Sequence, residues 1–274
     1  MRNQPLGIIG HGIVGKAFTN TFKDTVRLFV YDKNIPECQN NLPLVLANCY
    51  IIFVAVPTPM KESGEIDLSY IHEVLDSLKY EHKLVVIRST IVSGTTKELQ
   101  KTYSNLRIVY NPEFLSERNS LADMERTDRV VIGGKPEDCD IVQDIYNLVF
   151  PQARYVLTDS TTAEMIKYAA NVTLAGQVMI ANDLFRLCQT LETDWSVVRN
   201  TIILDPLIGK NNKVPGPDKD LGFGGKCLPK DLRALTYLAS TKGLSLEMLN
   251  QIWESNLKVR TNLDWLTIEG ATSK

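Results

Sequence analysis

The first half of the chain alternates short apolar runs with stretches whose apolar residues recur at helical spacing. Seven runs predict β-strands: Leu6–Gly10, Arg27–Asp32, Tyr50–Val56, Leu84–Arg88, Arg107–Val109, Val130–Gly133 and Arg154–Leu157. Helical spacing between them is clearest over Leu68–Leu78 and Thr95–Tyr103. Strands rich in Val and Ile that alternate with helices are typical of a parallel sheet covered on both faces. We therefore expect the first half to be an α/β domain.

The strand pattern stops near residue 158, and a helical pattern follows. Thr161-Thr162-Ala163-Glu164 fits a capping box. Apolar residues then recur at helical period as far as Leu187, which predicts a helix of about 30 residues, or ~45 Å. Further helices are expected over Trp195–Ile203, Pro229–Ser240 and Ser245–Val259. The second half should therefore be all-helical.

Composition narrows the class of protein. The 274 residues, of which 44% are hydrophobic, suffice for one large domain or two smaller ones. A net charge of −2 offers no basic surface to nucleic acid or to anionic lipid, and no apolar run is long enough to span a membrane. The five cysteines have no metal-like spacing, so we expect neither a metal site nor a disulfide framework, and a reduced, cytoplasmic protein is favoured.

A glycine pattern follows the first predicted strand. The segment Gly10–Gly15 reads G-x-G-x-x-G, and Asp32 ends the next strand, 17 residues after Gly15. Such glycines let a pyrophosphate approach the backbone at a helix N-terminus, while the acid accepts hydrogen bonds from a ribose. This predicts NAD rather than NADP, although Lys33 beside the acid could tolerate a 2′-phosphate. The alternative is a glycine-rich turn of another α/β protein. The cofactor contacts predicted here are Gly10, Gly12, Ile13, Val14, Gly15 and Asp32.

Two polar residues interrupt the apolar pattern of the long helix. Lys167 and Asn171 are four residues apart and share a face. Together they could bind an oxyanion that develops on a substrate carbon, or orient a water. A lysine that only extends its charge to solvent is the alternative.

The segment L-G-F-G-G-K-C-L-P-K-D places one cysteine at the predicted start of a helix. Pro after Cys227 favours a first helical turn, and Lys226 and Lys230 flank the thiol, which favours its thiolate. Asp231 follows one turn on. The alternative is a buried structural cysteine, which is our interpretation of Cys38, Cys49, Cys139 and Cys188. A dinucleotide site with such a cysteine suggests oxidation of an alcohol to an aldehyde, thiolate addition, a second oxidation to a thioester, and hydrolysis to a carboxylate.

Six separated motifs carry a family resemblance over about residues 5–260. They are Gly10–Gly15, Val56–Pro59, Arg88–Thr90, Asn111–Glu117, Ala163–Asn171 and Phe223–Asp231. In this order they resemble the UDP-glucose/GDP-mannose 6-dehydrogenase family, and most of all UDP-glucose 6-dehydrogenase. The resemblance implies a Rossmann-like NAD-binding domain followed by an all-helical dimerisation domain like the C-terminal domain of 6-phosphogluconate dehydrogenase. It also implies oxidation of C6 of a nucleotide sugar to a uronate for polysaccharide biosynthesis, with reduction of two NAD⁺, in a homodimer.

The resemblance also assigns roles to residues. Cys227 matches the nucleophile, and Lys167, Asn171 and Asp231 match the groups that stabilise the alkoxide and position water. The catalytic set is completed by Thr90, Glu113 and Glu117. Cofactor contacts implied in this way are Thr58, Thr90 and Glu117. Substrate contacts implied are Glu113, Phe114, Leu115, Lys167, Asn171, Phe223 and Gly224.

Two departures from the family's pattern qualify this expectation. The expected domains are 1–158 for NAD, 159–262 for the helical domain with the cysteine loop, and a tail 263–274 that is frayed over Ile268–Lys274; the family's third, C-terminal domain is absent from this short form. Leu207 stands where the family's D-P-R-I-G has an arginine that reaches the sugar, so sugar recognition must differ. Lys210, Lys213 or Lys219 could compensate.

Two other functions stay open at this point. A two-electron dehydrogenase of the hydroxyacid type would use Lys167 and Asn171 but would not need Cys227. A non-catalytic dinucleotide-binding dimer would need a partner chain to supply the missing domain.

Overall fold

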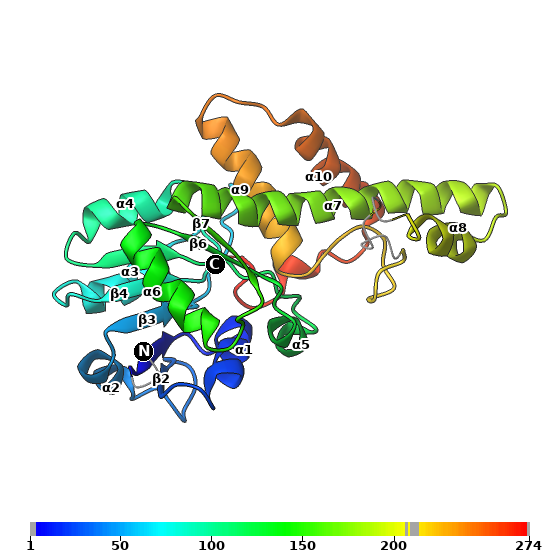
Figure 1. Ribbon diagram of the computed structural model, residues 1–274. Helices are drawn as coiled ribbons and strands as arrows, with labels where there is room; N and C mark the ends of the chain where they lie inside the picture. The colour runs from blue at the N-terminus through cyan, green and yellow to red at the C-terminus, as the bar shows by residue number, and fades with distance from the viewer. Residues whose placement is uncertain (1–3, 206–207, 209–213, 273–274) are drawn as a thin grey trace. The chain divides into compact units, whose positions relative to one another are not determined.

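The computed structural model describes residues 4–205, 208 and 214–272. The chain divides into two compact units. Unit 1 comprises residues 1–58 and 68–167, and unit 2 comprises residues 59–67 and 168–274. The boundary at Lys167 falls inside one long helix (Figure 1).

Unit 1 is built on a seven-stranded sheet in the order β2-β1-β3-β4-β5-β6-β7. The strands are β1 (Leu6–Ile9), β2 (Leu28–Tyr31), β3 (Ile51–Val54), β4 (Leu84–Ile87), β5 (Arg107–Tyr110), β6 (Arg129–Gly133) and β7 (Arg154–Thr158). All seven predicted strands are therefore confirmed, and the Rossmann-like α/β expectation with them. The chain order reverses between β1 and β3, which pair in parallel. Ligands of open parallel sheets bind at such a switch point, beyond the carboxyl ends of the strands.

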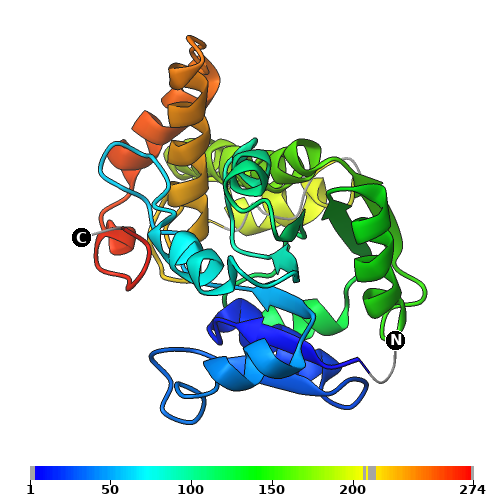
Figure 2. The ribbon, with the colours of Figure 1, turned by 90° about the vertical axis from the view of Figure 1, so that its left-hand side faces the viewer.

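Helices cover both faces of this sheet because the side chains of each strand alternate between two cores. They are α1 (Ile13–Phe22), α2 (Leu42–Asn48), α3 (Ser69–Leu78), α4 (Thr95–Thr102), α5 (Ser120–Glu125) and α6 (Pro136–Asn147). Phe18 of α1 and Tyr146 of α6 pack on one face with Ile8, whereas Ile9 joins Leu75 of α3 on the other. Figures 1 and 2 show the ribbons of these helices around the sheet. The strands β1, β3 and β4 are fully buried, which explains their continuous apolar runs.

The pairing of β5 with β6 departs from an all-parallel sheet. It is antiparallel, with Tyr110 opposite Gly133, while every other pairing is parallel. Helix α5, which connects the two strands, has only six residues. Helices between most of the strands were expected, and the two given by residue range, Leu68–Leu78 and Thr95–Tyr103, correspond to α3 and α4.

The capping box expected at Thr161–Glu164 is wrong. The helix α7 (Ser160–Thr190) is capped by Asp159, whose carboxylate accepts hydrogen bonds from the backbone N–H groups of Thr161 and Thr162. Glu164 instead reaches a neighbouring helix and accepts hydrogen bonds from Gly94 N (2.6 Å) and Thr96 N (2.8 Å), at the start of α4. A capping motif in the sequence does not specify which helix the acid caps.

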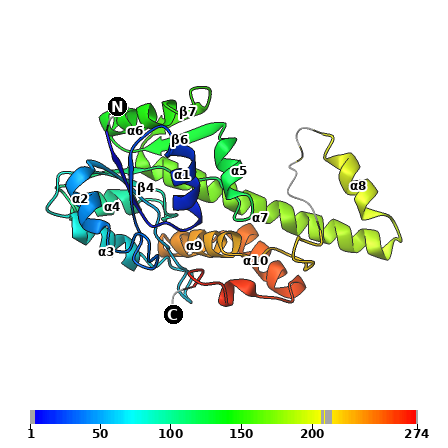
Figure 3. The same cartoon turned by 90° about the horizontal axis from the view of Figure 1, so that it is seen from below.

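Unit 2 is helical in its described residues, as expected. It contains most of α7 with α8 (Trp195–Ile202), α9 (Cys227–Thr241) and α10 (Glu247–Val259). Helices α9 and α10 run side by side, and α8 lies at the far end of α7 (Figure 3). A small core joins Met179 of α7 and Leu232 of α9 to Trp253 of α10.

The frayed tail expected over Ile268–Lys274 is wrong as far as Thr272, where the described residues end. Trp265 and Ala271 are buried and pack against Met60 of the 59–67 segment. The backbone N–H of Met60 also donates a hydrogen bond to the carbonyl of Ala271 (2.9 Å). The residues after Ile268 are mostly small and polar, so their composition did not predict burial. The anchoring depends on only two apolar residues, Trp265 and Ala271.

Candidate functional site

The predicted dinucleotide loop lies at the carboxyl end of β1. Gly10 has a φ of +93°, and a Cβ there would lie 2.4 Å from the Ala55 carbonyl oxygen. A Cβ on Gly15 would lie 2.0 Å from the Gly10 carbonyl oxygen. These two glycines are therefore required by the chain itself. Gly12 differs, because a Cβ there would meet nothing within 4 Å, and Gly12 is the N-cap residue of α1.

Asp32 closes this loop from β2. Its carboxylate accepts hydrogen bonds from the backbone N–H of His11 (2.7 Å) and of Asn34 (2.9 Å). Burial lowers the pKa of His11, with Lys16 adding to the effect and Asp32 opposing it, so a neutral imidazole is favoured beside the loop. The acid is thus fixed at the edge of the glycine loop, as the fingerprint requires.

These residues fit NAD. The space over Gly12 is open at the N-terminus of a ten-residue helix, where backbone N–H groups and the helix dipole favour a pyrophosphate. The half-buried Asp32 carboxylate is held at the next strand end, where it can accept from ribose hydroxyls. Ile13 and Val14 form the first turn of α1. All the fingerprint residues therefore lie together at the switch point of the sheet.

The loops after β3 and β4 are joined by side-chain hydrogen bonds. The Thr58 hydroxyl donates to the Thr90 carbonyl (2.8 Å), and the Ser89 hydroxyl donates to the Val56 carbonyl (2.7 Å). Thr58 is buried and Thr90 half-buried. The structure brings these two predicted residues together.

Glu113 and Lys167 form a buried ion pair in unit 1. Their oxygen and nitrogen lie 3.0 Å apart, with side-chain exposures of 9% and 4%. The other oxygen of Glu113 accepts from the backbone N–H of Leu115 (2.7 Å). The Lys167 ammonium also lies 5.6 Å from the centre of the Phe114 ring. Lys167 is therefore not a solvent-directed lysine.

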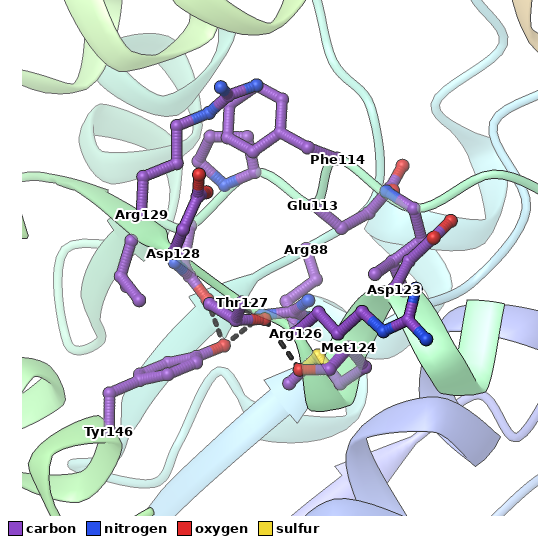
Figure 4. A pocket seen from close by; sticks show the side chains of 14 residues that line it. Arg88, Glu113, Phe114, Asp123, Met124, Arg126, Thr127, Asp128, Arg129 and Tyr146 are labelled. Atoms are coloured by element: carbon purple, nitrogen blue, oxygen red, sulfur yellow. Dashed lines mark hydrogen bonds between the residues drawn. The ribbon is translucent and has the colours of Figure 1, made fainter. Parts of the chain in front are cut away.

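A pocket of about 130 Å³ adjoins this pair within unit 1 (Figure 4). Glu113, Phe114 and Leu115 line it, and the Arg129 guanidinium stacks on the Phe114 ring at 4.4 Å. Arg88, at its floor, is buried and donates to the Asn111 side-chain oxygen (2.5 Å) and to the Tyr146 hydroxyl. Burial raises the pKa of Tyr146 to about 12, which keeps the hydroxyl neutral. No spacing in the sequence identifies Arg88, Asn111 and Tyr146 as a group, because three separate elements contribute them.

Glu117 and Glu113 differ in their exposure to solvent. It is exposed on the loop that precedes α5, whereas Glu113 is buried. Its predicted catalytic and cofactor roles therefore depend on a solvent-accessible carboxylate.

In unit 2, Cys227 is the first residue of α9 and is exposed. The three cysteines Cys38, Cys49 and Cys139 are buried. Burial raises the pKa of Cys49 and of Cys139 to about 11, which suppresses their thiolates. The contrast supports the interpretation of Cys227 as the chemically accessible thiol.

A buried polar cluster lies one turn after Cys227. The Asn171 amide donates a hydrogen bond to one oxygen of Asp231, and the Lys230 ammonium donates to the other at 2.6 Å. Asn171, Lys230 and Asp231 have exposures of 8%, 5% and 1%. Burial of a carboxylate with an ammonium and an amide fixes all three side chains.

The glycine loop before Cys227 is held by residues that the sequence interpretation missed. Asn256 accepts from Phe223 N (2.7 Å) and donates to Phe223 O (3.0 Å). Asp264 accepts from Gly225 N with both oxygens at 3.1 Å. A Cβ on Gly224 would lie 2.1 Å from an Arg260 nitrogen. We call this group, Asn256, Arg260 and Asp264, the loop anchor.

The remaining predicted residues lie in or near the loop before α9. Phe223 is buried in the core of unit 2, so its side chain stabilises the loop. Leu207, Lys210 and Lys213 lie outside the described residues, and Lys219 has a φ of +65° in a turn. Within the described part of the chain, no three His, Cys, Asp or Glu side chains gather as a metal site would need, and none of its helices is long and apolar enough to cross a bilayer.

Comparisons with known proteins agree with this geometry. Residues 23–150 match the NAD binding domain of the UDP-glucose/GDP-mannose dehydrogenase family, and residues 161–258 match its central domain. A UDP-glucose 6-dehydrogenase of Rickettsia felis is 35% identical over 228 residues, covering 80% of this chain and 50% of that protein. One of Bacillus subtilis is 33% identical over 261 residues, covering 90% and 55%. The chain thus spans about half the length of the curated relatives it matches.

A solved structure is similar over nearly the whole chain. The UDP-glucose dehydrogenase of the archaeon Pyrobaculum islandicum superposes with a TM-score of 0.81 at 26% identity, over 93% of this chain and 68% of that one. The segments that match the family models contain Asp32, the Glu113–Lys167 pair and Cys227. The glycine loop Gly10–Gly15 precedes the first of these segments. The chain therefore belongs to the UDP-glucose/GDP-mannose dehydrogenase family and carries the NAD-binding and central domains of that family.

Proposed function

We propose that this chain oxidises the C6 hydroxymethyl group of a nucleotide sugar, UDP-glucose first among the candidates, to the uronate. The overall reaction converts R–CH₂OH, two NAD⁺ and water into R–COO⁻, two NADH and three protons. The observation that carries the proposal is the exposed Cys227 at the start of α9, one turn before the buried Asp231. A hydride transfer alone requires no such thiol.

Cys227 is proposed as the nucleophile between the two oxidations. Its thiolate adds to the C6 aldehyde and gives a thiohemiacetal, and loss of a second hydride gives a thioester. Bound NAD⁺ supplies the two-electron acceptor in each oxidation. Water then attacks the thioester carbon, the C–S bond breaks, and the thiolate is restored.

The remaining site residues are proposed to handle charge and protons. Lys167 and Asn171 donate hydrogen bonds to the oxygen that becomes negative in the alkoxide and in the tetrahedral adducts. Glu113, paired with Lys167 at 3.0 Å, accepts the proton of the alcohol or of the attacking water through that pair. Asp231, held by Asn171 and Lys230, positions the water. Glu117, Thr58 and Thr90 are proposed to contact the cofactor, and Phe114, Leu115, Phe223 and Gly224 the sugar nucleotide.

Counting cofactor tests the mechanism. The purified chain is incubated with NAD⁺ and with UDP- and GDP-hexoses in turn, and NADH is counted per sugar consumed. We expect two NADH per UDP-glucose and expect Cys227→Ser to abolish uronate formation. Cys188→Ser, at a half-buried thiol of the same unit, is the control and should retain turnover. One NADH per substrate that persists in Cys227→Ser would establish instead a two-electron dehydrogenase.

A third outcome would support the non-catalytic alternative. If the chain binds NAD⁺ but oxidises no sugar, the same assay is repeated with candidate partner chains that carry a nucleotide-binding domain. Rescue of turnover by such a chain would show that this polypeptide supplies only part of an enzyme.

We also propose a homodimer through unit 2, in which residues 159–262 form the dimerisation domain. An apolar stripe at coiled-coil spacing runs along α7 and into the turn that follows it. Ile180, Leu184 and Leu187 lie on the helix and Leu191 just beyond its end, with exposures of 64%, 40%, 53% and 62%. Single apolar residues are common on protein surfaces, but a continuous stripe of them marks an interaction site. A second copy of the helix would cover this stripe. Light scattering should give a dimer for the wild type and a monomer for Leu187→Glu. Arg186→Glu, beside the stripe, is the control.

The cellular setting is a further part of the proposal. We place the protein in the cytoplasm, because its cysteines are expected to stay reduced there. The proposed reaction would then supply a uronate for polysaccharide biosynthesis. Fractionation of cells together with measurement of the uronate pool in a deletion strain tests both points.

A further inference from the structure

Lys33, the residue after the ribose-binding Asp32, is held by helix α3. Its ammonium lies 2.7 and 3.0 Å from the two carboxylate oxygens of Glu73 and 4.8 Å from the centre of the Tyr70 ring. Tyr70 and Glu73 are three residues apart on α3 and present adjacent side chains. The hydrogen bond from Lys33 to Glu73 raises the pKa of Lys33, so the ammonium is charged at neutral pH.

This arrangement bears on which dinucleotide the chain accepts. NAD and NADP differ only in a phosphate on the 2′-hydroxyl of the adenosine ribose. A carboxylate at the end of the second strand favours the free hydroxyl, whereas a nearby cation accommodates the phosphate. Asp32 is the carboxylate, and its two oxygens are fixed by the His11 and Asn34 backbone. Lys33 is the cation nearest to it in the chain.

The position of Glu73 changes what Lys33 can do. The Glu73 carboxylate pairs with the Lys33 ammonium through both of its oxygens, so it offsets the charge of the lysine that follows Asp32 and directs that ammonium toward α3. A 2′-phosphate would then meet a lysine whose charge is already paired. Tyr70 reinforces the effect, because its ring attracts the same ammonium.

We propose that Glu73 is a specificity determinant for the cofactor: it holds Lys33 away from the adenosine ribose and thereby excludes NADP. The proposal concerns recognition of the dinucleotide alone and does not depend on the sugar that the chain oxidises. It requires only that the chain bind NAD, so binding, rather than turnover, is the measurement.

Calorimetric titration of four proteins with NAD⁺ and NADP⁺ tests it. The proteins are the wild type, Glu73→Gln, Lys33→Met and the double variant. In Glu73→Gln we expect the NADP⁺ dissociation constant to fall about three- to tenfold, as expected for one or two exposed charge interactions, while that for NAD⁺ is unchanged. In the Lys33→Met background most of the gain should disappear. The gain should also shrink as salt is raised, because the charges are exposed.

A charge-matched control separates a local effect from a change in net charge. Glu98 forms a similarly exposed pair with Lys101 on α4, at 2.8 Å, and Glu98→Gln removes the same charge from unit 1. This variant should leave both dissociation constants unchanged. The proposal is overturned if Glu73→Gln changes NAD⁺ and NADP⁺ binding equally, if Glu98→Gln has the same effect, or if the gain is undiminished in the double variant. Binding of neither dinucleotide by the wild type would overturn it as well, whereas NAD⁺ binding without sugar oxidation would leave it standing.

Discussion

The side-chain amide of Asn171 donates a hydrogen bond to the carboxylate of Asp231, and both residues are more than nine-tenths buried. Asn171 belongs to α7, and Asp231 lies one turn after Cys227 on α9. The bond therefore ties the helix that begins with the proposed nucleophile to the long helix. It also directs the amide, because its nitrogen faces the carboxylate.

Asp231 stabilises the fold as well as the proposed site. Asp231→Asn removes the charge that balances Lys230, whose side chain is only 6% exposed. Loss of one partner of a buried pair costs about 3 kcal/mol, so urea denaturation should show a loss of this size in the free energy of unfolding. The double variant Lys230→Met/Asp231→Asn should recover most of it. Lys101→Met, which breaks an exposed pair, is the control and should cost less than ~1 kcal/mol. If Asp231→Asn and Lys101→Met lowered the free energy of unfolding by the same amount, the buried-pair interpretation would be wrong.

The three fingerprint glycines should separate into two classes. Gly12→Ala adds a methyl group in open space, so the melting temperature should be unchanged. NAD⁺ affinity should fall, because we expect the backbone to receive the pyrophosphate in that space. Gly15→Ala adds a methyl group 2.0 Å from the Gly10 carbonyl oxygen and should lower the melting temperature itself. Thermal denaturation and calorimetry on both variants check this. A Gly12→Ala variant with wild-type affinity would exclude this loop as the pyrophosphate site.

Substitution by alanine should lower the free energy of unfolding at Gly224 and raise it at Gly176. Gly224→Ala adds a methyl group 2.1 Å from Arg260 and 2.4 Å from Asp264, so the loop anchor must shift, and the alkylation rate of Cys227 should change. Gly176 lies within α7, where a Cβ would lie 3.5 Å from the Cδ1 atom of Ile252 on α10, an ordinary van der Waals contact. Alanine there should stabilise the helix by about 0.5–1 kcal/mol. The unfolding free energy and the rate of iodoacetamide labelling measure both effects. Wild-type labelling of Gly224→Ala would show that the anchor does not govern the cysteine.

Asp218 forms an ion pair with Arg260 of the loop anchor, at 2.7 Å, and this pair should weaken at acid pH. Burial opposes ionisation of Asp218, but hydrogen bonds from Arg260 and the backbone outweigh it, and the pKa is lowered below the ordinary 3.8. A lowered pKa in the folded state gives stability that is present above the unfolded-state pKa and is lost as pH falls through the folded value. The difference in unfolding free energy between the wild type and Asp218→Asn should therefore be constant above about pH 5 and shrink below pH ~4. Asp183→Asn, at an exposed helix position, is the control. A difference that grows toward acid pH would contradict this sign.

Some of the site could be predicted because its residues are close in sequence. Gly10–Gly15 act through the backbone of one turn, and Asp32 follows at the end of the adjacent strand. Lys167 and Asn171 were expected on one helical face, and both are buried there. The sequence could not show their partners, Glu113 and Asp231, by spacing, because these lie far away in the chain and meet them only after packing.

Glu164 illustrates the limit of local patterns. Its spacing from Thr161 fits a cap of its own helix, yet it is fully buried and caps α4 across unit 1. Burial raises the pKa of Glu164, and the hydrogen bonds from Thr96 and Gly94 act in the opposite direction. A buried acid takes the donors that remain unsatisfied nearby, and only the folded arrangement decides which those are.

The sequence by itself determined the periodicity of the elements, the glycine turn with its acid, and the chemical types at the site. These follow from φ/ψ preference, side-chain alternation and intrinsic reactivity, which are local properties. Tertiary structure alone decided the antiparallel β6, the anchored tail, the loop anchor behind Cys227 and the capture of Lys33 by Glu73. Each of these depends on which distant surfaces pack together, and that is set by the burial of the whole chain rather than by any short stretch of it.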